Sequence, residues 1–285
     1  MFPCFDQPSL KATFTFTVTT PGHWEAISNN PVASKESVGE KTLWKFTTTP
    51  RIPMYLAVLI AGAYSHVHDT YKGGKEVPLG IYCRKSMAQY LDPDDIFLLT
   101  KQGFDYFEKT FGLAYPFDKY DQIAVVDFNF GAMENAGAVT FREDLLVFRS
   151  HMPEKMYMSR ANVILHEMAH MWFGNFVTMS WWDDLWLNES FAEFMAYLAM
   201  AEGTRFKGGW AGFNSERKNW AYRQDQLSST HPIFADMVDI EAVNANFDGI
   251  TYAKGASVLQ QLVAHVGREN FITGLQKYFA QHAWG

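Results

Sequence analysis

The sequence is poor in several features that would each point to a class of protein. Only two of its 285 residues are cysteine, Cys4 and Cys83, and they stand 79 positions apart without a CxxC pair. Two such thiols are more typical of isolated buried residues than of a disulfide framework or a cysteine-based metal site. A basic excess is also lacking, because 24 Lys and Arg stand against 31 Asp and Glu, for a formal net charge of −7. Nucleic-acid binders carry a basic patch or stripe, so the composition argues against a nucleic-acid partner.

Long hydrophobic runs are missing as well. The longest apolar stretch, residues 54–64, is about half of the roughly 20 residues that a membrane-spanning helix needs, and it contains Gly62. We therefore expect a buried strand there and no membrane segment. The residues that follow Met1 include neither a basic segment nor an apolar core, so we expect no secretory signal. Together with the two unpaired thiols, this indicates a cytoplasmic protein.

What the chain does have is a large apolar content and, at its start, the pattern of β-strands. Hydrophobic residues make up 48% of the sequence and aromatic residues 16%, which is enough for a sizeable core. Over residues 12–19, Ala, Phe, Phe and Val alternate with four threonines, the period of a strand with one buried face. We expect further strands over residues 24–27, 43–48 and 54–61, and a turn or junction over residues 69–78.

Helical patterns take over from about residue 92. We expect helices over residues 92–110, 159–173 with Ser159 as the N-cap, 188–203, and 258–279 with a break at Gly267. Two strands, 122–127 and 138–141, are expected to flank a stretch of mostly small residues. Strands first and helices later predict an α+β protein, with part of a β-sandwich over residues 1–65 and a mixed α/β domain over residues 66–285. Because four strands make a thin β domain, we expect the chain to be a piece of a longer protein.

The strongest chemical signal is His166-Glu167-Met168-Ala169-His170, an H-E-x-x-H motif inside a predicted helix. Histidines at i and i+4 lie on one helix face, roughly 5–6 Å apart at Cβ, so both rings can bind one ion. Glu167 lies beside them, where it can take a proton from a water molecule that the metal activates. Glu189 follows His170 by 19 positions at the head of the next predicted helix, and antiparallel packing would direct its carboxylate to the histidines. Two nitrogens, one carboxylate and an open position are the arrangement of catalytic zinc sites.

Two further groups of polar residues have more ambiguous patterns. Glu193, one turn beyond Glu189, is either the acceptor for the second N–H of a ligand histidine or a surface glutamate. His66 and His68 have the spacing to share one face of a strand. A pair of histidines without a third ligand favours ordinary strand residues over a metal site.

Other motifs are spread over nearly the whole chain. They are FPCFDQP at residues 2–8, the run Gly131-Ala132-Met133-Glu134-Asn135, residues 164–175 around the H-E-x-x-H motif, residues 181–190 around Glu189, and ITYAKG at residues 250–255. In this order they resemble the aminopeptidase N family of zinc metallopeptidases: a stretch of its N-terminal β domain, its exopeptidase motif, its two zinc-binding segments and the segment with its catalytic tyrosine. Residues 220–227 suggest a bacterial member.

The resemblance implies a thermolysin-like catalytic domain and an enzyme that releases N-terminal amino acids from peptides with a free N-terminus. It implies one Zn²⁺ per chain held by His166, His170 and Glu189, with Glu167 and Tyr252 as catalytic residues. A carboxylate such as that of Glu134 can hold the α-ammonium group and reject a mid-chain peptide, which offers no charge to offset its desolvation. The substrate-binding residues implied in the same way are Phe130, Gly131, Ala132, Met133, Glu134 and Asn135.

Several alternatives stay open at this stage. A thermolysin-like endopeptidase would share the zinc site but not the Glu134 motif, and a leukotriene epoxide hydrolase would add a lipid substrate. An inactive or peptide-binding fragment is the third alternative. The resemblance also implies two parts that these residues do not include: a second acidic residue upstream of residues 2–8 that helps to bind the amine, and a C-terminal helical domain that closes over the active site.

Overall fold

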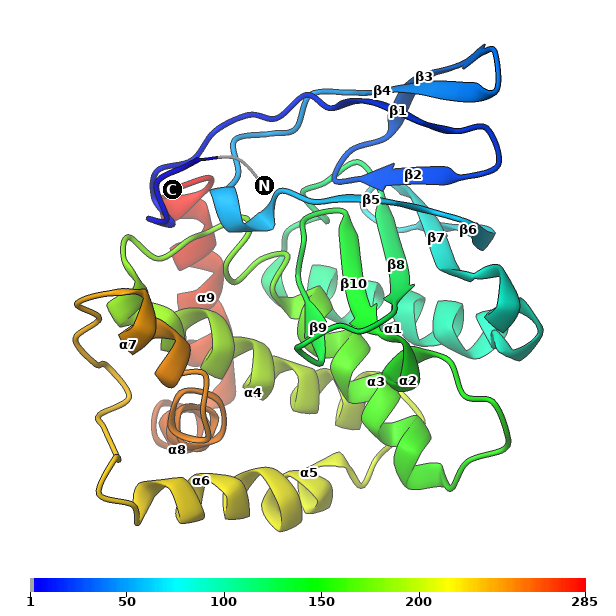
Figure 1. Ribbon diagram of the computed structural model, residues 1–285. Coiled ribbons are helices and arrows are strands. Elements are labelled where there is room, and N and C mark those ends of the chain that lie inside the picture. The colour runs from blue at the N-terminus through cyan, green and yellow to red at the C-terminus, as the bar shows by residue number, and fades with distance from the viewer. Residues whose placement is uncertain (1–2) are drawn as a thin grey trace.

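A computed structural model of the protein describes residues 3–285 (Figure 1). Met1, and Phe2 at the start of the motif over residues 2–8, lie outside the described residues. A β-rich N-terminal part is followed by a part in which helices pack around a mixed sheet, which confirms the predicted α+β class. No helix of the described chain combines the length and the apolar character that crossing a membrane requires.

Two small antiparallel sheets form the N-terminal part. One has the strand order β1 (Thr17–Pro21), β4 (Lys41–Phe46), β3 (Val32–Val38), and the other pairs β2 (Glu25–Ser28) with β5 (Leu59–Gly62). A small core of Ala26, Trp44 and Phe46 lies between them. Strand β3 is absent from the sequence prediction because its residues are almost all exposed and show no alternation of polar and apolar side chains.

Two details of this part differ from the prediction. The first strand begins at Thr17 rather than at residue 12, although Ala12 forms an isolated bridge with Ile52. The run predicted as one strand over residues 54–61 begins with a 3₁₀ turn, η1 (Met54–Leu56), and only then becomes β5. Pro53 explains the difference, because it has no N–H for a ladder and its carbonyl accepts a bond from Leu56 that closes the turn.

A five-stranded mixed sheet lies at the centre of the molecule, in the order β6, β7, β8, β10, β9 (Figure 1). Strands β7 (Glu76–Arg84), β8 (Tyr120–Val125) and β10 (Ala138–Arg142) run parallel, while β6 (Tyr64–Lys72) and β9 (Ala132–Met133) are antiparallel edges. The predicted turn over residues 69–78 is wrong in extent. The hairpin turn takes only residues 73–75, and Tyr71 pairs with Val77 as a buried part of the ladder.

Helices supply the rest of the fold. They are α1 (Pro93–Phe111), α2 (Glu143–Leu146), α3 (Glu154–Ala169), α4 (Leu185–Gly203), α5 (Gly209–Gly212), α6 (Lys218–Asp225), α7 (Ile240–Ala245), α8 (Gly255–Val266) and α9 (Arg268–His282). Short 3₁₀ turns occur at η2 (Lys85–Tyr90) and η3 (Trp182–Asp184), and π-helical turns at η4 (Phe213–Arg217) and η5 (Ile250–Lys254). The long helices thus form close to their predicted places.

The helix with the H-E-x-x-H motif begins and ends earlier than predicted. It starts after Pro153, which presets the backbone at the helix start, so Ser159 lies inside α3 and caps nothing. It ends at Ala169 rather than at Phe173, because the chain tightens there into bonds of 3₁₀ type before Gly174, whose φ of 120° ends the turn.

The core packs α1, α3 and α4 against the sheet and against α8 and α9. Phe107, Phe111 and Trp172 are essentially inaccessible to solvent and contact one another in stacked or tilted pairs. Burying each such ring contributes roughly 1.5–3 kcal/mol. This core fixes α3 against α4, the two helices that carry the candidate metal ligands.

Candidate active site

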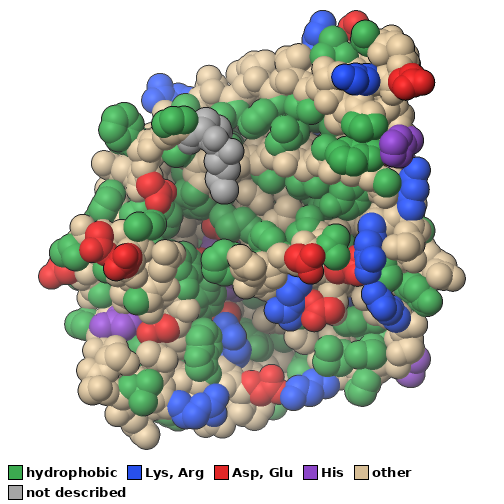
Figure 2. Space-filling view, viewed as in Figure 1, with side chains coloured by type: hydrophobic (Ala, Val, Ile, Leu, Met, Phe, Trp, Pro, Cys, Tyr) green, Lys and Arg blue, Asp and Glu red, His purple; other side chains and the backbone are tan. Residues whose placement is uncertain are grey.

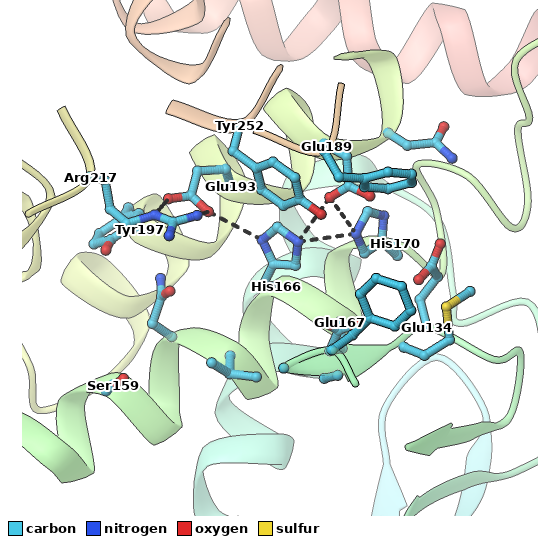
Figure 3. Close-up of a pocket in the computed structure, with 18 of the residues that line it drawn as sticks. Glu134, Ser159, His166, Glu167, His170, Glu189, Glu193, Tyr197, Arg217 and Tyr252 are labelled. Carbon is cyan, nitrogen blue, oxygen red and sulfur yellow. Dashed lines mark hydrogen bonds and ion pairs between the residues drawn. The ribbon is translucent and has the colours of Figure 1, made fainter. Parts of the chain in front are cut away.

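Three side chains, from α3, from the residue that caps its C-terminal end and from α4, converge on one point (Figure 3). Nε2 of His166 lies 3.1 Å from Nε2 of His170, and Oε2 of Glu189 lies 3.3 Å from the first nitrogen and 3.4 Å from the second. All three residues are buried. The structure therefore brings together the three residues that the sequence predicts as metal ligands.

The donor set fits a tetrahedral metal ion. Ligand atoms at about 2.0–2.1 Å from a tetrahedrally coordinated zinc are about 3.3 Å from one another, which is close to the distances found here. The ring orientation agrees, because Nδ1 of His170 lies 3.0 Å from the carbonyl oxygen of Phe173. Only a protonated Nδ1 can donate to that oxygen, so Nε2 of His170 is left with its lone pair toward the other two ligands.

The second nitrogen of His166 faces another carboxylate. Nδ1 lies 3.5 Å from Oε2 of Glu193, whose side chain is only 2% exposed. The guanidinium group of Arg217 donates to both oxygens of Glu193, from Nε at 2.6 Å and from Nη2 at 3.0 Å. Burial alone would raise the pKa of Glu193, but the charge of Arg217 and the contacts with His166 outweigh it and lower that pKa to about 2.

The carboxylates of the cluster raise the pKa of both histidines. Burial lowers the pKa of His166, yet Glu189, Glu193 and Glu167 outweigh this effect and raise it to about 10. Glu134 and Glu189 likewise raise the pKa of His170 to about 9 against the effect of burial. The pKa of Glu189 itself is held far below its usual range despite burial, because both histidines bond to it. The carboxylates thus favour positive charge at the point where the two rings meet, whether a proton or a bound cation carries it.

Glu167 has a hydrogen-bonding atom without a partner. Its Oε2 is buried and has no hydrogen-bond partner among the described residues. Burial, with the charges of Glu134 and Glu189, outweighs the two histidines and raises the pKa of Glu167 to about 7. A carboxylate with such a pKa can both accept and release a proton near neutral pH. Glu134, Glu167 and His170 also form a second compact group of potential ligand atoms.

These residues open onto a cavity of about 810 Å³. The hollow lies among the helices α3 and α4, the turns η4 and η5 and the segment that includes β9, on the face that Figure 2 shows. Side chains of mixed character line it, and five consecutive positions of its wall are Phe130, Gly131, Ala132, Met133 and Glu134. Burial and the charge of Glu189 raise the pKa of Glu134, although His170 opposes them. Five of the six residues predicted to bind substrate therefore share one wall with the metal-ligand group.

Asn135 is the exception, since it does not line the cavity. Its Nδ2 donates to the carbonyl oxygen of Leu56 at 3.3 Å, and its Oδ1 accepts from the hydroxyl of Thr140 at 3.2 Å. Asn175 holds the preceding residue, because its Nδ2 donates to the backbone oxygen of Glu134 at 2.8 Å. The amide of Asn135 thus anchors the loop that presents Glu134.

The same loop is anchored from the N-terminal part. Nδ2 of Asn29 donates to the carbonyl oxygens of Ala136 at 2.9 Å and Leu56 at 2.8 Å, and its Oδ1 accepts from the backbone of Val58 at 3.0 Å. Gly137 adopts φ 71°, and a Cβ there would lie 2.3 Å from the carbonyl oxygen of Asn29. Only glycine fits at this crossing point.

Tyr252 lies over the metal-ligand group on the π-helical turn η5. Its ring is nearly parallel to that of His166, with 5.8 Å between the ring centres. The carboxylate of Asp248 caps the start of η5, accepting from the backbone of Ile250 at 2.9 Å and Thr251 at 3.1 Å. Burial and the charge of Glu189 raise the pKa of Tyr252 well above its usual value, so the phenol keeps its proton as a hydrogen-bond donor.

Sequence reasoning missed some residues that line the cavity. Tyr55 comes from η1 in the N-terminal part; its hydroxyl accepts from Asn188 at 3.2 Å, and its ring packs 5.4 Å from that of Trp182. Arg217 comes from η4, which lies outside every predicted element. Tyr55 sits in an apolar run and Arg217 in a polar helix, so no local pattern distinguishes either one. His66 and His68, by contrast, contact one another and Tyr82, away from this cluster.

Comparisons with known proteins agree with the geometry. The profile of the peptidase family M1 domain matches residues 97–285, and that of the peptidase M1 N-terminal domain matches residues 1–56. The chain is 57% identical over 288 residues to the aminopeptidase N of Streptomyces lividans, and the match covers 100% of this chain and 33% of that protein. It is 38% identical over 301 residues to human glutamyl aminopeptidase, covering 99% and 29% respectively. The tricorn protease-interacting factor F2 of Thermoplasma volcanium is 39% identical over 284 residues, covering 100% and 35%.

The chain therefore spans about a third of the length of the curated relatives that it matches. The two profiles follow one another along the chain in the order of the β-rich part and the mixed α/β part. Since the M1 domain profile alone covers about two thirds of the sequence, the chain belongs to peptidase family M1.

Proposed function

We propose that the protein is a zinc-dependent aminopeptidase that removes the N-terminal residue from peptides with a free α-amino group. The observation that carries the proposal is that the buried carboxylate of Glu134 lies on the wall of the cavity into which His166, His170 and Glu189 converge. The names of the aminopeptidase relatives support it. Because those relatives are about three times as long, the activity of the whole protein is part of the proposal.

The three metal ligands are the residues that would hold Zn²⁺. A zinc ion supplies Lewis acidity there, which polarises a carbonyl group and makes water acidic enough to lose a proton near neutral pH. Glu167 accepts the proton of the attacking water and passes it to the leaving amine, a role that suits its buried Oε2, which has no hydrogen-bond partner among the described residues. The phenol of Tyr252 donates to the oxyanion of the tetrahedral intermediate.

Glu134 restricts the reaction to the chain end. Its buried carboxylate pairs with the α-ammonium group of the substrate, and an internal peptide would leave that carboxylate without a charged partner. Phe130, Gly131, Ala132 and Met133 complete the wall along which the first residue lies. The products are a free amino acid and a peptide that is shorter by one residue. Both cysteines are free thiols, which supports the cytoplasm as the site of action.

The experiment is the hydrolysis of alanyl- and leucyl-anilides by the purified chain, with and without a chelator. We expect turnover that the chelator abolishes and added Zn²⁺ restores, no turnover by Glu167→Gln, and no cleavage of the N-acetylated substrates. Glu202→Gln is the matched control on the outer side of α4 and should keep full activity. Cleavage of acetylated peptides would instead identify an endopeptidase. A folded, zinc-loaded chain without turnover would mean either that segments outside this chain are required or that the protein binds peptides without cutting them.

A further inference from the structure

Glu193 is a buried carboxylate that pairs with Arg217, a partly exposed arginine at the edge of the candidate site. Glu193 follows Glu189 by one helical turn, so both carboxylates lie on the same face of α4. A buried carboxylate is costly unless charge and hydrogen bonds satisfy it. Arg217 donates one hydrogen bond to each oxygen of Glu193. The Oε2 atom of Glu193 also lies 3.5 Å from Nδ1 of His166 (Figure 3).

Arg217 is itself held in one orientation. It ends the π-helical turn η4, and its guanidinium carbon lies 4.7 Å from the ring centre of Trp220 and 5.8 Å from that of Tyr252. Stacking of the planar guanidinium group on these rings keeps its two N–H donors directed at one carboxylate. Arg217 therefore links three segments around the site: α4 through Glu193, the start of α6 through Trp220, and η5 through Tyr252.

The geometry points to Glu193 and Arg217 as positioning residues for the metal ligand His166: Arg217 fixes the carboxylate of Glu193, and Glu193 holds the imidazole with Nδ1 protonated and Nε2 facing the metal. This inference rests on the metal site of the proposed function. Glu193 would then serve His166 as the carbonyl oxygen of Phe173 serves His170, because that oxygen is the partner of Nδ1 of His170. Each histidine then has one nitrogen for the metal and one for the protein.

The alternative is that Glu193 and Arg217 only stabilise the fold and do not affect metal binding. The same contacts clamp α4 to the α5–α6 segment, and breaking any buried ion pair costs stability. Glu202 offers a matched control, because it also lies on α4 and also pairs with an arginine, Arg268, but on the outer side of the helix. Both Glu→Gln changes remove one charge from the same helix, and only one of them faces a histidine.

The experiment measures the Zn²⁺ dissociation constant by competition with a chromogenic chelator, and the melting temperature of each metal-free variant. Removing the outer partner of a metal-ligating histidine typically weakens metal binding 10–100-fold, so Glu193→Gln should do this while Glu202→Gln binds as the wild type does. Arg217→Met should weaken binding about tenfold. In the double variant it should add nothing to the effect of Glu193→Gln, because Arg217 acts through Glu193.

Unchanged zinc affinity in Glu193→Gln, with only a lower melting temperature, would overturn the inference and leave a structural clamp. Additive losses in the double variant would also contradict it. If Glu193→Gln does not fold, Arg217→Lys decides the question. Lysine keeps the positive charge but cannot donate to both carboxylate oxygens in the same geometry, so this variant should still weaken zinc binding. A wild-type chain that binds no zinc would refute the proposed function as well, whereas a zinc-binding wild type with unaffected variants would refute the inference alone.

Discussion

Gly255 is the position where one added methyl group should do the most measurable harm. A Cβ at this residue would lie 1.9 Å from Oγ and 2.7 Å from Cβ of Ser190, which follows the candidate metal ligand Glu189. Ser190 cannot simply turn away, because its hydroxyl donates to the carbonyl oxygen of Thr251 at 2.6 Å. We expect Gly255→Ala to force α8 away from α4 and so to shift Tyr252 relative to the metal ligands.

The size of the effect follows from two contributions. Overpacking a well-filled core costs typically about 1–3 kcal/mol, and losing the buried bond from Ser190 costs about 1 kcal/mol more. A loss of about 2–4 kcal/mol in a chain of 285 residues lowers the melting temperature by about 3–7 °C, at an unfolding entropy of about 2.1 cal/mol/K per residue. Thermal unfolding followed by circular dichroism measures this shift.

The control is another helical glycine. A Cβ at Gly274, inside α9, meets nothing within 4 Å, so Gly274→Ala should stabilise the protein by roughly 0.5–1 kcal/mol through its better helix propensity. Replacing Ser190 by Gly in the Gly255→Ala background removes both atoms that the methyl would meet, and should recover part of the lost stability. If Gly255→Ala melts at or above the wild-type temperature, the close contact between α4 and α8 is refuted.

Three other variants test separate parts of the structure. Tyr252→Phe should lower kcat by about 10²–10³ with zinc affinity unchanged, and an unaltered kcat would exclude the phenol from the reaction. Asn29→Ala removes three hydrogen bonds, two of them buried and one partly buried, and should lower the free energy of unfolding by about 2–4 kcal/mol; a denaturant midpoint equal to that of the wild type would contradict this. Burial raises the pKa of Asp95, but Arg205 and Arg160 outweigh it and hold that pKa below its usual range. Its stabilisation is therefore present at neutral pH and lost on acidification, so the stability difference between wild type and Asp95→Asn should narrow below about pH 4, and a difference independent of pH would refute the assignment.

The sequence predicts the parts of the site that local spacing controls. His166 and His170 share a helix face because they are four residues apart, and Glu189 meets them because the next long helix packs antiparallel to the first. Helix ends were less predictable, since α3 ends at Ala169 through the tightening of the chain before Gly174. Ser159 has the chemistry of a cap, but Pro153 occupies the N-cap position of the helix.

Other features depend on contacts between distant segments, which no window of sequence contains. Strand β3 forms because β4 lies beside it, although its own side chains are mostly exposed. Arg217 reaches Glu193 only because a π-helical turn places it there, and 24 positions separate the two residues. The amide of Asn135 turns toward Leu56 rather than into the cavity, and this orientation is set by the fold of the N-terminal part.

The contacts of Asn29 and Tyr55 affect whether the β-rich part and the helical part can be exchanged between homologues. Two separate family profiles match the β-rich and the helical parts, which suggests units that could be exchanged between relatives. Yet Asn29 is bonded to the backbone behind Glu134, and Tyr55 forms part of the cavity wall. A chimera that joins the β-rich part of one homologue to the helical part of another would therefore exchange part of the cavity wall as well, and the shape of its cavity would match neither parent.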